Sequence, residues 1–146
     1  MRARERRVTY RTRKDLTADV GTSLNTPRLV ADLVIPMLAS EAVEVAVVLC
    51  FSTKHRLLCA HELSRGSLDC TIIHPREVFK AAILANSAGI VVAHNHPSGD
   101  PAPSADDLRL TARLVQAGDV VGIDVLDHVI VAGNQYYSFL EGGQLR

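Results

Sequence analysis

Cysteine is scarce in this sequence, with three in 146 residues. Because the number is odd and no two cysteines form a C-x-x-C pair, we do not expect a framework of disulfides. Cys50 and Cys59 lie in apolar runs, where a thiol packs as a small hydrophobic group. We therefore expect buried thiols at these two positions rather than a nucleophile or a zinc ligand.

Long apolar runs are also missing. No stretch approaches the roughly 20 residues that a membrane-spanning helix requires, and no apolar segment follows the charged N-terminus as it does in a secretory signal peptide. We therefore expect a cytoplasmic protein with no membrane partner. Hydrophobic residues make up 47% of the chain and charged residues 22%, a composition that supports a packed core and, at this length, predicts one domain.

Net charge is the third thing that the chain lacks, since 16 basic side chains balance 16 acidic ones. The balance conceals two unlike parts. Residues 1–14 carry seven basic side chains and one acidic, a net charge of +6, which leaves −6 on the rest of the chain. A basic segment of this kind can neutralise nucleic-acid phosphates, or it can be a solvated chain end. Tyr10 is its only aromatic residue and lysines do not cluster in it, which favours the solvated end.

The apolar pattern of the first half predicts a helix, a pair of antiparallel strands and a second helix. Thr26 and Pro27 are typical of the N-cap and first turn of a helix, while Pro36 predicts a kink or an early end. The two strands are apolar runs separated by a short polar turn, and Pro75 is again typical of a first helical turn. The expected ranges are residues 26–38, 43–51, 56–62 and 75–87.

The second half predicts a central strand, a third helix and the closing strands. Residues 89–93 are almost wholly apolar, which is typical of a strand that is buried on both faces. Ser104 is expected to begin the third helix and Gly118 to end it. Further strands are expected at residues 124–126, 128–132 and about 136–140. The order of elements predicts an α/β fold in which a mixed sheet lies between helices.

The segment after the central strand, AHNHPSGDPAPSADD at residues 93–107, is the most informative for chemistry. Side chains of an extended segment alternate between two faces, so His94 and His96 point the same way and can share one metal ion. The next helix carries Asp106 and Asp107 in its first turn, and a carboxylate there can supply a third ligand. Two histidines, one carboxylate and a vacant fourth position are typical of a catalytic zinc site, because structural sites usually close with four protein ligands.

Each of these residues also has a purely structural interpretation. Histidines at a strand end are commonly hydrogen-bonded structural residues. Ser104 and Asp107, three residues apart, match a capping box that needs no metal. A cap explains neither histidine, however, so the combination at this spacing favours the metal interpretation.

The pattern from His94 to Pro97, followed after six residues by Ser104-x-x-Asp107, resembles the JAMM motif of the MPN/JAB metallopeptidases, and the longer string HNHPSGDPAPSADD resembles their RadC branch. The likeness extends over roughly residues 25–143. Its other matching segments are Pro75-Arg76-Glu77, Asn86, Leu126-Asp127-His128, Val129-Ile130-Val131 and Tyr137-Ser138-Phe139. Residues 25–146 are thus identified as a RadC-like MPN (JAB) domain. Residues 1–24 are expected to form a basic arm before it, and these 24 residues are fewer than the helix-hairpin-helix region that RadC members often carry would require.

The resemblance implies a cytidine-deaminase-like α-β-α sandwich in which His94, His96 and Asp107 hold Zn²⁺. It also implies a zinc-dependent hydrolase that acts on a peptide or isopeptide bond through a zinc-activated water. Ser104 is expected to help stabilise the oxyanion of the tetrahedral intermediate. Asn95 departs from the Ser or Thr that deubiquitinating members have between the histidines, so a ubiquitin-type substrate does not transfer to this chain.

The family also implies an upstream glutamate that acts as general base, and the sequence offers Glu41, Glu44 and Glu62. In the superfamily this glutamate begins the first apolar strand, a position that matches Glu44. Glu62, near the end of the second strand, is the second choice. A glutamate at a strand start can also simply face the solvent, and sequence does not show which of these lies within hydrogen-bond reach of the water.

Two other functions stay open at the level of sequence. One is a DNA-repair-associated accessory protein with a vestigial or structural zinc site, which contacts phosphates through residues 1–14. The other is a non-catalytic interaction module, although such modules generally lose the motif that this chain keeps. A zinc deaminase is excluded because H-x-E followed by P-C-x-x-C does not occur, and the adjacent Asp127 and His128 lack a nucleophile, so we expect a structural or cleft-lining role for them.

Overall fold

A computed structural model describes residues 21–66 and 73–145 of the chain. Residues 1–14, which carry the predicted basic charge, and Cys70 lie outside the described residues. The order of elements is the predicted one, except that residues 124–132 form a single strand. In chain order they are α1 (Pro27–Leu38), β1 (Glu44–Phe51), β2 (Leu57–Gly66), α2 (Pro75–Leu84), β3 (Gly89–Asn95), α3 (Ala105–Val121), β4 (Asp124–Ala132) and β5 (Gln135–Ser138).

The strands form one mixed sheet in the order β2-β1-β3-β4-β5. β3 and β4 are parallel, whereas the other neighbouring strands are antiparallel. β3 lies at the centre, and all seven of its residues are buried, as the apolar pattern predicts for a strand covered on both faces.

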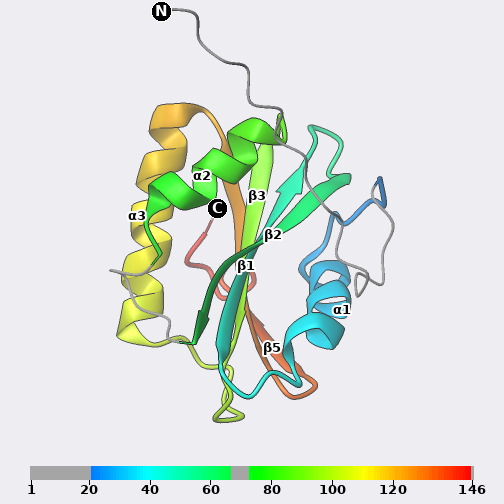
Figure 1. Cartoon of the computed structure of the whole chain (residues 1–146), viewed down its shortest axis with the longest axis vertical. Helices are drawn as coiled ribbons and strands as arrows, with labels where there is room; N and C mark the ends of the chain where they lie inside the picture. The colour runs from blue at the N-terminus through cyan, green and yellow to red at the C-terminus, as the bar shows by residue number, and fades with distance from the viewer. Residues whose placement is uncertain (1–20, 67–72, 146) are drawn as a thin grey trace, which may run out of the picture.

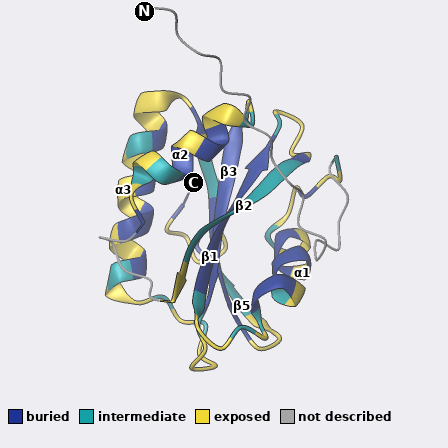
Figure 2. Cartoon of the chain, in the orientation of Figure 1, coloured by how far each residue is buried: buried dark blue, intermediate teal, exposed yellow. Residues whose placement is uncertain are grey.

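Helices cover both faces of this sheet (Figure 1). The alternation of side chains along β1 divides the core: Val45, Val47 and Leu49 pack with α1, whereas Ala46 and Val48 pack with α2 and α3. Figure 2 shows the buried positions of the helices on the sides that face the sheet. The predicted α-β-α sandwich with a mixed sheet is therefore confirmed.

α1 ends at Leu38, the last residue of its expected range, whereas α2 ends at Leu84, three residues before the expected residue 87, and the end of α3 also differs from the prediction. α1 continues for two residues beyond Pro36, because the missing amide removes one helical hydrogen bond while buried Met37 and Leu38 hold the last turn against the core. α3 does not end at Gly118. A side chain at Gly118 would begin 2.5 Å from the carbonyl oxygen of Ile123, so this glycine allows a close approach within the helix. The helix ends at Gly122, whose φ of +76° lies in the left-handed region that glycine tolerates.

β4 is one strand rather than the two predicted. The register of its pairing with β3 shifts between Ile90 and Val91, so Leu126 is an extra residue in the ladder. This bulge lies where the sequence pattern breaks, which explains why the pattern predicts separate strands.

The N-terminal end of the described chain is joined to the sheet. Within the expected arm, the Gly21 amide donates to the Leu57 carbonyl at 2.7 Å, and the Leu24 amide donates to that of His55 at 2.9 Å. Cys50 and Cys59 lie opposite each other on β1 and β2 as free thiols, the first buried and the second half-buried. Among the described residues, no helix is both long enough and apolar enough to cross a membrane.

Candidate metal centre

The two histidines of the motif lie at the C-terminal end of the central strand. His94 is the penultimate residue of β3, and His96 follows its last residue, where its amide donates to the Val131 carbonyl of β4 at 2.8 Å. The loop after β3 leads to Ser104, the N-cap of α3, and this brings Asp107 in the first helical turn back to the end of the strand. Residues from a strand and from the following helix thus meet at one point of the fold.

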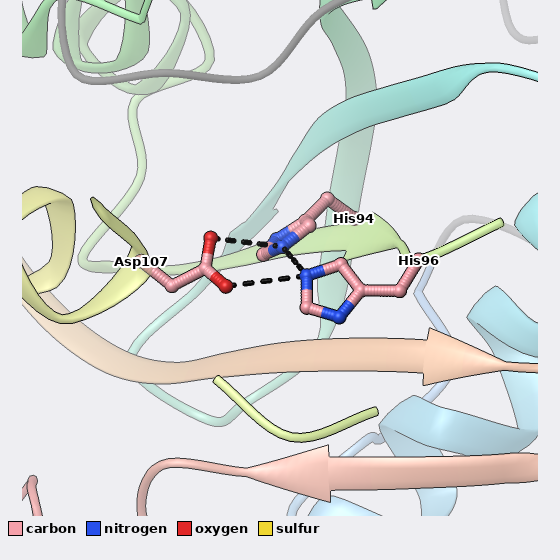
Figure 3. A group of neighbouring side chains, drawn as sticks. All are labelled: His94, His96 and Asp107. Atoms are coloured by element: carbon pink, nitrogen blue, oxygen red, sulfur yellow. Dashed lines mark hydrogen bonds and ion pairs between the residues drawn. The ribbon is translucent and has the colours of Figure 1, made fainter. Parts of the chain in front are cut away.

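Figure 3 shows that the imidazole rings and the carboxylate point toward one another. His94 Nε2 lies 3.1 Å from His96 Nε2 and 3.2 Å from Asp107 Oδ1, and His96 Nε2 lies 3.2 Å from Asp107 Oδ2. The side chains of His94 and Asp107 are 0% and 5% exposed, while that of His96 is 13% exposed. These three residues can hold a metal ion, and His96 lies nearest to the solvent.

The hydrogen bonds of His96 define which of its ring nitrogens is protonated. Its Nδ1 lies 2.9 Å from the carbonyl oxygen of Asp100, which only accepts, so the proton is on Nδ1. The Nε2 lone pair of the neutral ring therefore faces Asp107. The hydrogen bond that Nε2 donates to Asp107 when the ring is protonated raises the pKa of His96, against the lowering effect of burial.

The protonation of His94 follows from a buried chain of hydrogen bonds. The Thr111 hydroxyl donates to the Asp107 carbonyl at 2.8 Å, so its oxygen must accept from His128 Nδ1, which lies 2.6 Å away. Burial lowers the pKa of His128 well below its usual value and keeps the ring neutral. His128 Nε2 then accepts from His94 Nδ1 at 2.8 Å, which leaves the His94 Nε2 lone pair directed at Asp107.

The centre therefore gathers two nitrogen lone pairs and a carboxylate without a protein proton between them. Burial raises the pKa of Asp107, but the hydrogen bonds that the His94 and His96 rings donate when Nε2 carries a proton outweigh it and keep this pKa well below its usual range. Such a buried, electron-rich group is stable only when a cation is present, either a proton on one imidazole or a metal ion. This donor set fits a divalent metal ion.

Comparison with known proteins identifies the family. A family model described as a RadC-like JAB domain matches residues 24–144. The chain belongs to this family.

Three relatives show how the RadC-like JAB domain compares with longer proteins. A UPF0758 protein of Methanosarcina barkeri is 42% identical over 120 residues, which are 82% of this chain and 52% of that protein. A UPF0758 protein of Thermotoga maritima is 48% identical over 70% of this chain and 46% of its own length. A third, of Herminiimonas arsenicoxydans, is 46% identical over 86% of this chain and 56% of its own length. The chain thus spans about half the length of the curated relatives it matches.

The strand register separates two of the three candidate glutamates of this RadC-like JAB domain, Glu44 and Glu62. Glu44 precedes Ala46 by two residues, and Ala46 lies opposite His94, so the Glu44 side chain is on the face of the sheet that carries the metal centre. Its charge also contributes to raising the pKa of His96. Glu62 lies opposite Val47, which packs with α1 on the other face, and it pairs with Arg65 at 2.7 Å. Arg65 also pairs with Glu41, at 2.9 Å.

Ser104 and Asp107 form the capping box that the sequence also predicts. The Asp107 amide donates to Ser104 Oγ at 3.1 Å, and the Ser104 amide donates to Asp107 Oδ2 at 2.9 Å. The cap and the metal centre do not compete, since a carboxylate has enough lone pairs for both. The two interpretations of this motif therefore hold together.

Sequence reasoning missed Thr111 and assigned His128 only a structural or cleft-lining role. A signal for Thr111 was present, because it follows Asp107 by four residues and lies on the same face of α3. His128 reaches His94 from the neighbouring strand, and this contact depends on the pairing of β3 with β4.

Proposed function

We propose that this protein is a zinc-dependent hydrolase of the JAMM type, which cleaves an amide or isopeptide bond. The proposal rests on the convergence of the two Nε2 lone pairs with the Asp107 carboxylate. Tetrahedral zinc with bonds of about 2.0–2.1 Å keeps its ligand atoms about 3.3 Å apart. The separations of 3.1 and 3.2 Å in the centre are close to this value and support a tetrahedral divalent ion such as zinc.

Three protein ligands leave one coordination position for water or substrate, as in catalytic rather than structural zinc sites. A bound Zn²⁺ supplies a Lewis acid and lowers the pKa of water to about 7. The protein supplies a buried setting in which His128 and Thr111 hold His94 in the tautomer that binds metal.

Glu44 and Ser104 complete the proposed reaction. Glu44 lies on the face of the metal centre, and we assign it the general base that takes the proton from water and returns it to the leaving amine. Ser104 is exposed, and its oxygen accepts the Asp107 amide hydrogen. The hydroxyl proton therefore stays available for the oxyanion that forms on the substrate carbonyl.

Metal analysis tests the centre. Purified wild-type protein should contain about one zinc per chain, and His96→Ala should contain almost none. Asp107→Asn, which keeps an oxygen for the cap, should also lose zinc because it removes the charged ligand. Retention of zinc in both variants contradicts the assignment of the ligands.

Cleavage of a library of peptides and lysine-linked isopeptides tests the reaction. Glu44→Gln should keep its zinc and lose cleavage, because an amide cannot act as a base. Glu62→Gln is the matched control, since that glutamate lies on the opposite face and pairs with Arg65. Loss of cleavage in the Glu62 variant, with full activity in the Glu44 variant, reverses the assignment of the base.

A second candidate function rests on the charge of +6 in residues 1–14. In this proposal the chain is an accessory protein that binds DNA through phosphate contacts. Duplex binding should then weaken steeply between 50 and 200 mM salt, and it should disappear when residues 1–14 are removed. Equal binding by the shortened protein rejects this candidate.

A further inference from the structure

Asn95 lies between the two histidines of the motif but faces the other side of the sheet. It is 2% exposed, and both the oxygen and the nitrogen of its amide bind backbone groups. Its Oδ1 accepts from the Val45 amide at 2.7 Å, and its Nδ2 donates to the Val43 carbonyl at 2.9 Å and to the Glu41 carbonyl at 3.4 Å.

These partners flank the candidate base. Val43 and Val45 are the residues before and after Glu44, so one side chain contacts the backbone on both sides of it. The paired residues of β1 and β3 end at Ala46 and His94, and beyond that point the Asn95 amide makes the link between the two strands. The residue that joins the two histidines in sequence therefore also holds the backbone of Glu44.

The chemistry of the two main contacts explains why the side chain is an amide. The Val45 amide requires an acceptor and the Val43 carbonyl requires a donor, and a carboxamide presents both from one rigid plane. A carboxylate has no donor for the carbonyl, and a Ser hydroxyl is shorter and carries one proton. A leucine of similar size can hydrogen-bond to neither group and leaves both of them buried without this partner.

We propose that Asn95 is a positioning residue that sets the place of Glu44 relative to the metal ligands His94 and His96. This inference rests on the proposed function, because it assumes that Glu44 acts on a group bound at the metal. A purely structural role predicts only a loss of stability when Asn95 is changed. A positioning role predicts in addition that the metal centre responds as it does when Glu44 itself is changed.

The experiment uses the full chain loaded with Co²⁺, whose visible absorption reports the environment of the ion. Absorption spectra are recorded against pH for wild type, Glu44→Gln, Asn95→Ala and the double variant, together with the amount of cobalt bound. Ser87→Ala is the matched control, because Ser87 Oγ accepts from the Phe51 amide at 3.1 Å and donates to the Gly89 carbonyl at 2.6 Å. It thus links β1 and β3 at the opposite end of the same ladder.

We expect Asn95→Ala to bind cobalt fully and to move the pH midpoint of the spectrum in the direction of Glu44→Gln, by at least half as much. The double variant should move it no further than Glu44→Gln alone, since the two changes act on one interaction. Ser87→Ala should lower the melting temperature and leave the midpoint in place. Should Asn95→Ala be too unstable to purify, Asn95→Ser, which retains a polar atom, should give a smaller shift in the same direction.

The inference is overturned when Glu44→Gln moves the midpoint and the Asn95 variants leave it where it is in wild type. A different result identifies failure of the proposed function. If wild type binds no cobalt, or if Glu44→Gln leaves the midpoint unchanged, Glu44 does not act on the metal centre and Asn95 has no base to position.

Discussion

At each end of the β1–β3 ladder a polar side chain links the two strands, but the residues that surround the two links differ. At one end the Ser87 hydroxyl links the backbone of Phe51 to that of Gly89. At the other end the Asn95 amide links β3 to the backbone on both sides of Glu44. Both side chains make hydrogen bonds with backbone groups at an end of the ladder. A polar link at a strand end therefore has no functional meaning by itself, and its neighbours decide what it does.

The residues around the two links differ in the free-energy cost of their burial. At the Ser87 end of the ladder the chain buries Phe51 and Ile90, whereas at the Asn95 end it buries ionisable groups on the opposite face from Asn95, among them His94 and Asp107. Burying such groups is unfavourable unless they are paired or coordinate an ion. Hydrogen bonds connect His94 through His128 to Thr111, so the metal end of the ladder contains more buried polar contacts than the other end. Substitutions at this end and substitutions away from it therefore test the difference.

The largest effect is expected from His128→Leu. Removing this ring leaves the His94 Nδ1 proton without its acceptor and removes the contact that holds the ring in place. Zinc affinity should fall about 10- to 100-fold, and the free energy of unfolding by about 1–3 kcal/mol. Competition with a chromophoric chelator measures the first and urea denaturation the second. Ser87→Ala should keep the wild-type affinity, and an unchanged affinity in His128→Leu removes His128 from the metal centre.

Acidic pH should weaken metal binding at His96. Its pKa is raised from 6.5 mainly by Asp107, so protons compete with the metal from a pH above that value. Affinity should fall about tenfold for each pH unit below the raised pKa, because one proton must leave. The raised pKa of His96 also makes the stability of the metal-free protein depend on pH. The contribution of His96 is fully present below the unfolded pKa and is lost as the pH rises through the folded pKa.

Isothermal titration from pH 5 to pH 8 measures the affinity, and thermal unfolding in chelator measures the stability. In the metal-free protein, Asp107→Asn should move the pH dependence of stability to lower pH, because it removes the hydrogen bond and the charge that raise the pKa of His96. A metal affinity that is constant across this range contradicts the predicted protonation of the centre.

Gly118→Ala, within α3 and away from the metal centre, should change stability but not metal binding. The new methyl group begins 2.5 Å from the Ile123 carbonyl oxygen, which belongs to the backbone and cannot move aside easily. The free energy of unfolding should fall by about 1–3 kcal/mol. Gly122→Ala meets no atom within 4 Å and should lose only about 1 kcal/mol through its left-handed φ. Equal zinc affinity in both variants and in wild type supports the contrast between the metal end of the ladder and the rest of the molecule. A large loss of affinity contradicts it.

The smallest effect is expected from Ser104→Ala. This variant removes the acceptor of the Asp107 amide, and the loss of an N-cap costs about 1 kcal/mol. Zinc content should stay at the wild-type level, because the Asp107 carboxylate still receives the backbone amide of residue 104. Ser104→Thr should restore the stability. Loss of zinc from Ser104→Ala shows instead that the cap holds the ligand in place.

Much of the fold follows from local pattern, and the errors have local causes. The order of helices and strands was predictable because apolar periodicity reports which side of each element meets the core. The predicted end of α3 was wrong because two glycines four residues apart both suit a helix end. Only their surroundings distinguish them: Gly118 lies against a backbone carbonyl, and Gly122 adopts the left-handed conformation. The bulge at Leu126 likewise depends on the neighbouring strand.

By itself, the sequence determined the donor set of the metal centre, since the spacing of His94, His96 and Asp107 follows from one strand, one loop and one helical turn. Only the tertiary structure decided which glutamate shares a face with it, because that depends on the register of β1 against β3 and β2. The same holds for the chain from His94 through His128 to Thr111. Its members are distant in sequence, and strand pairing and helix packing bring them into contact.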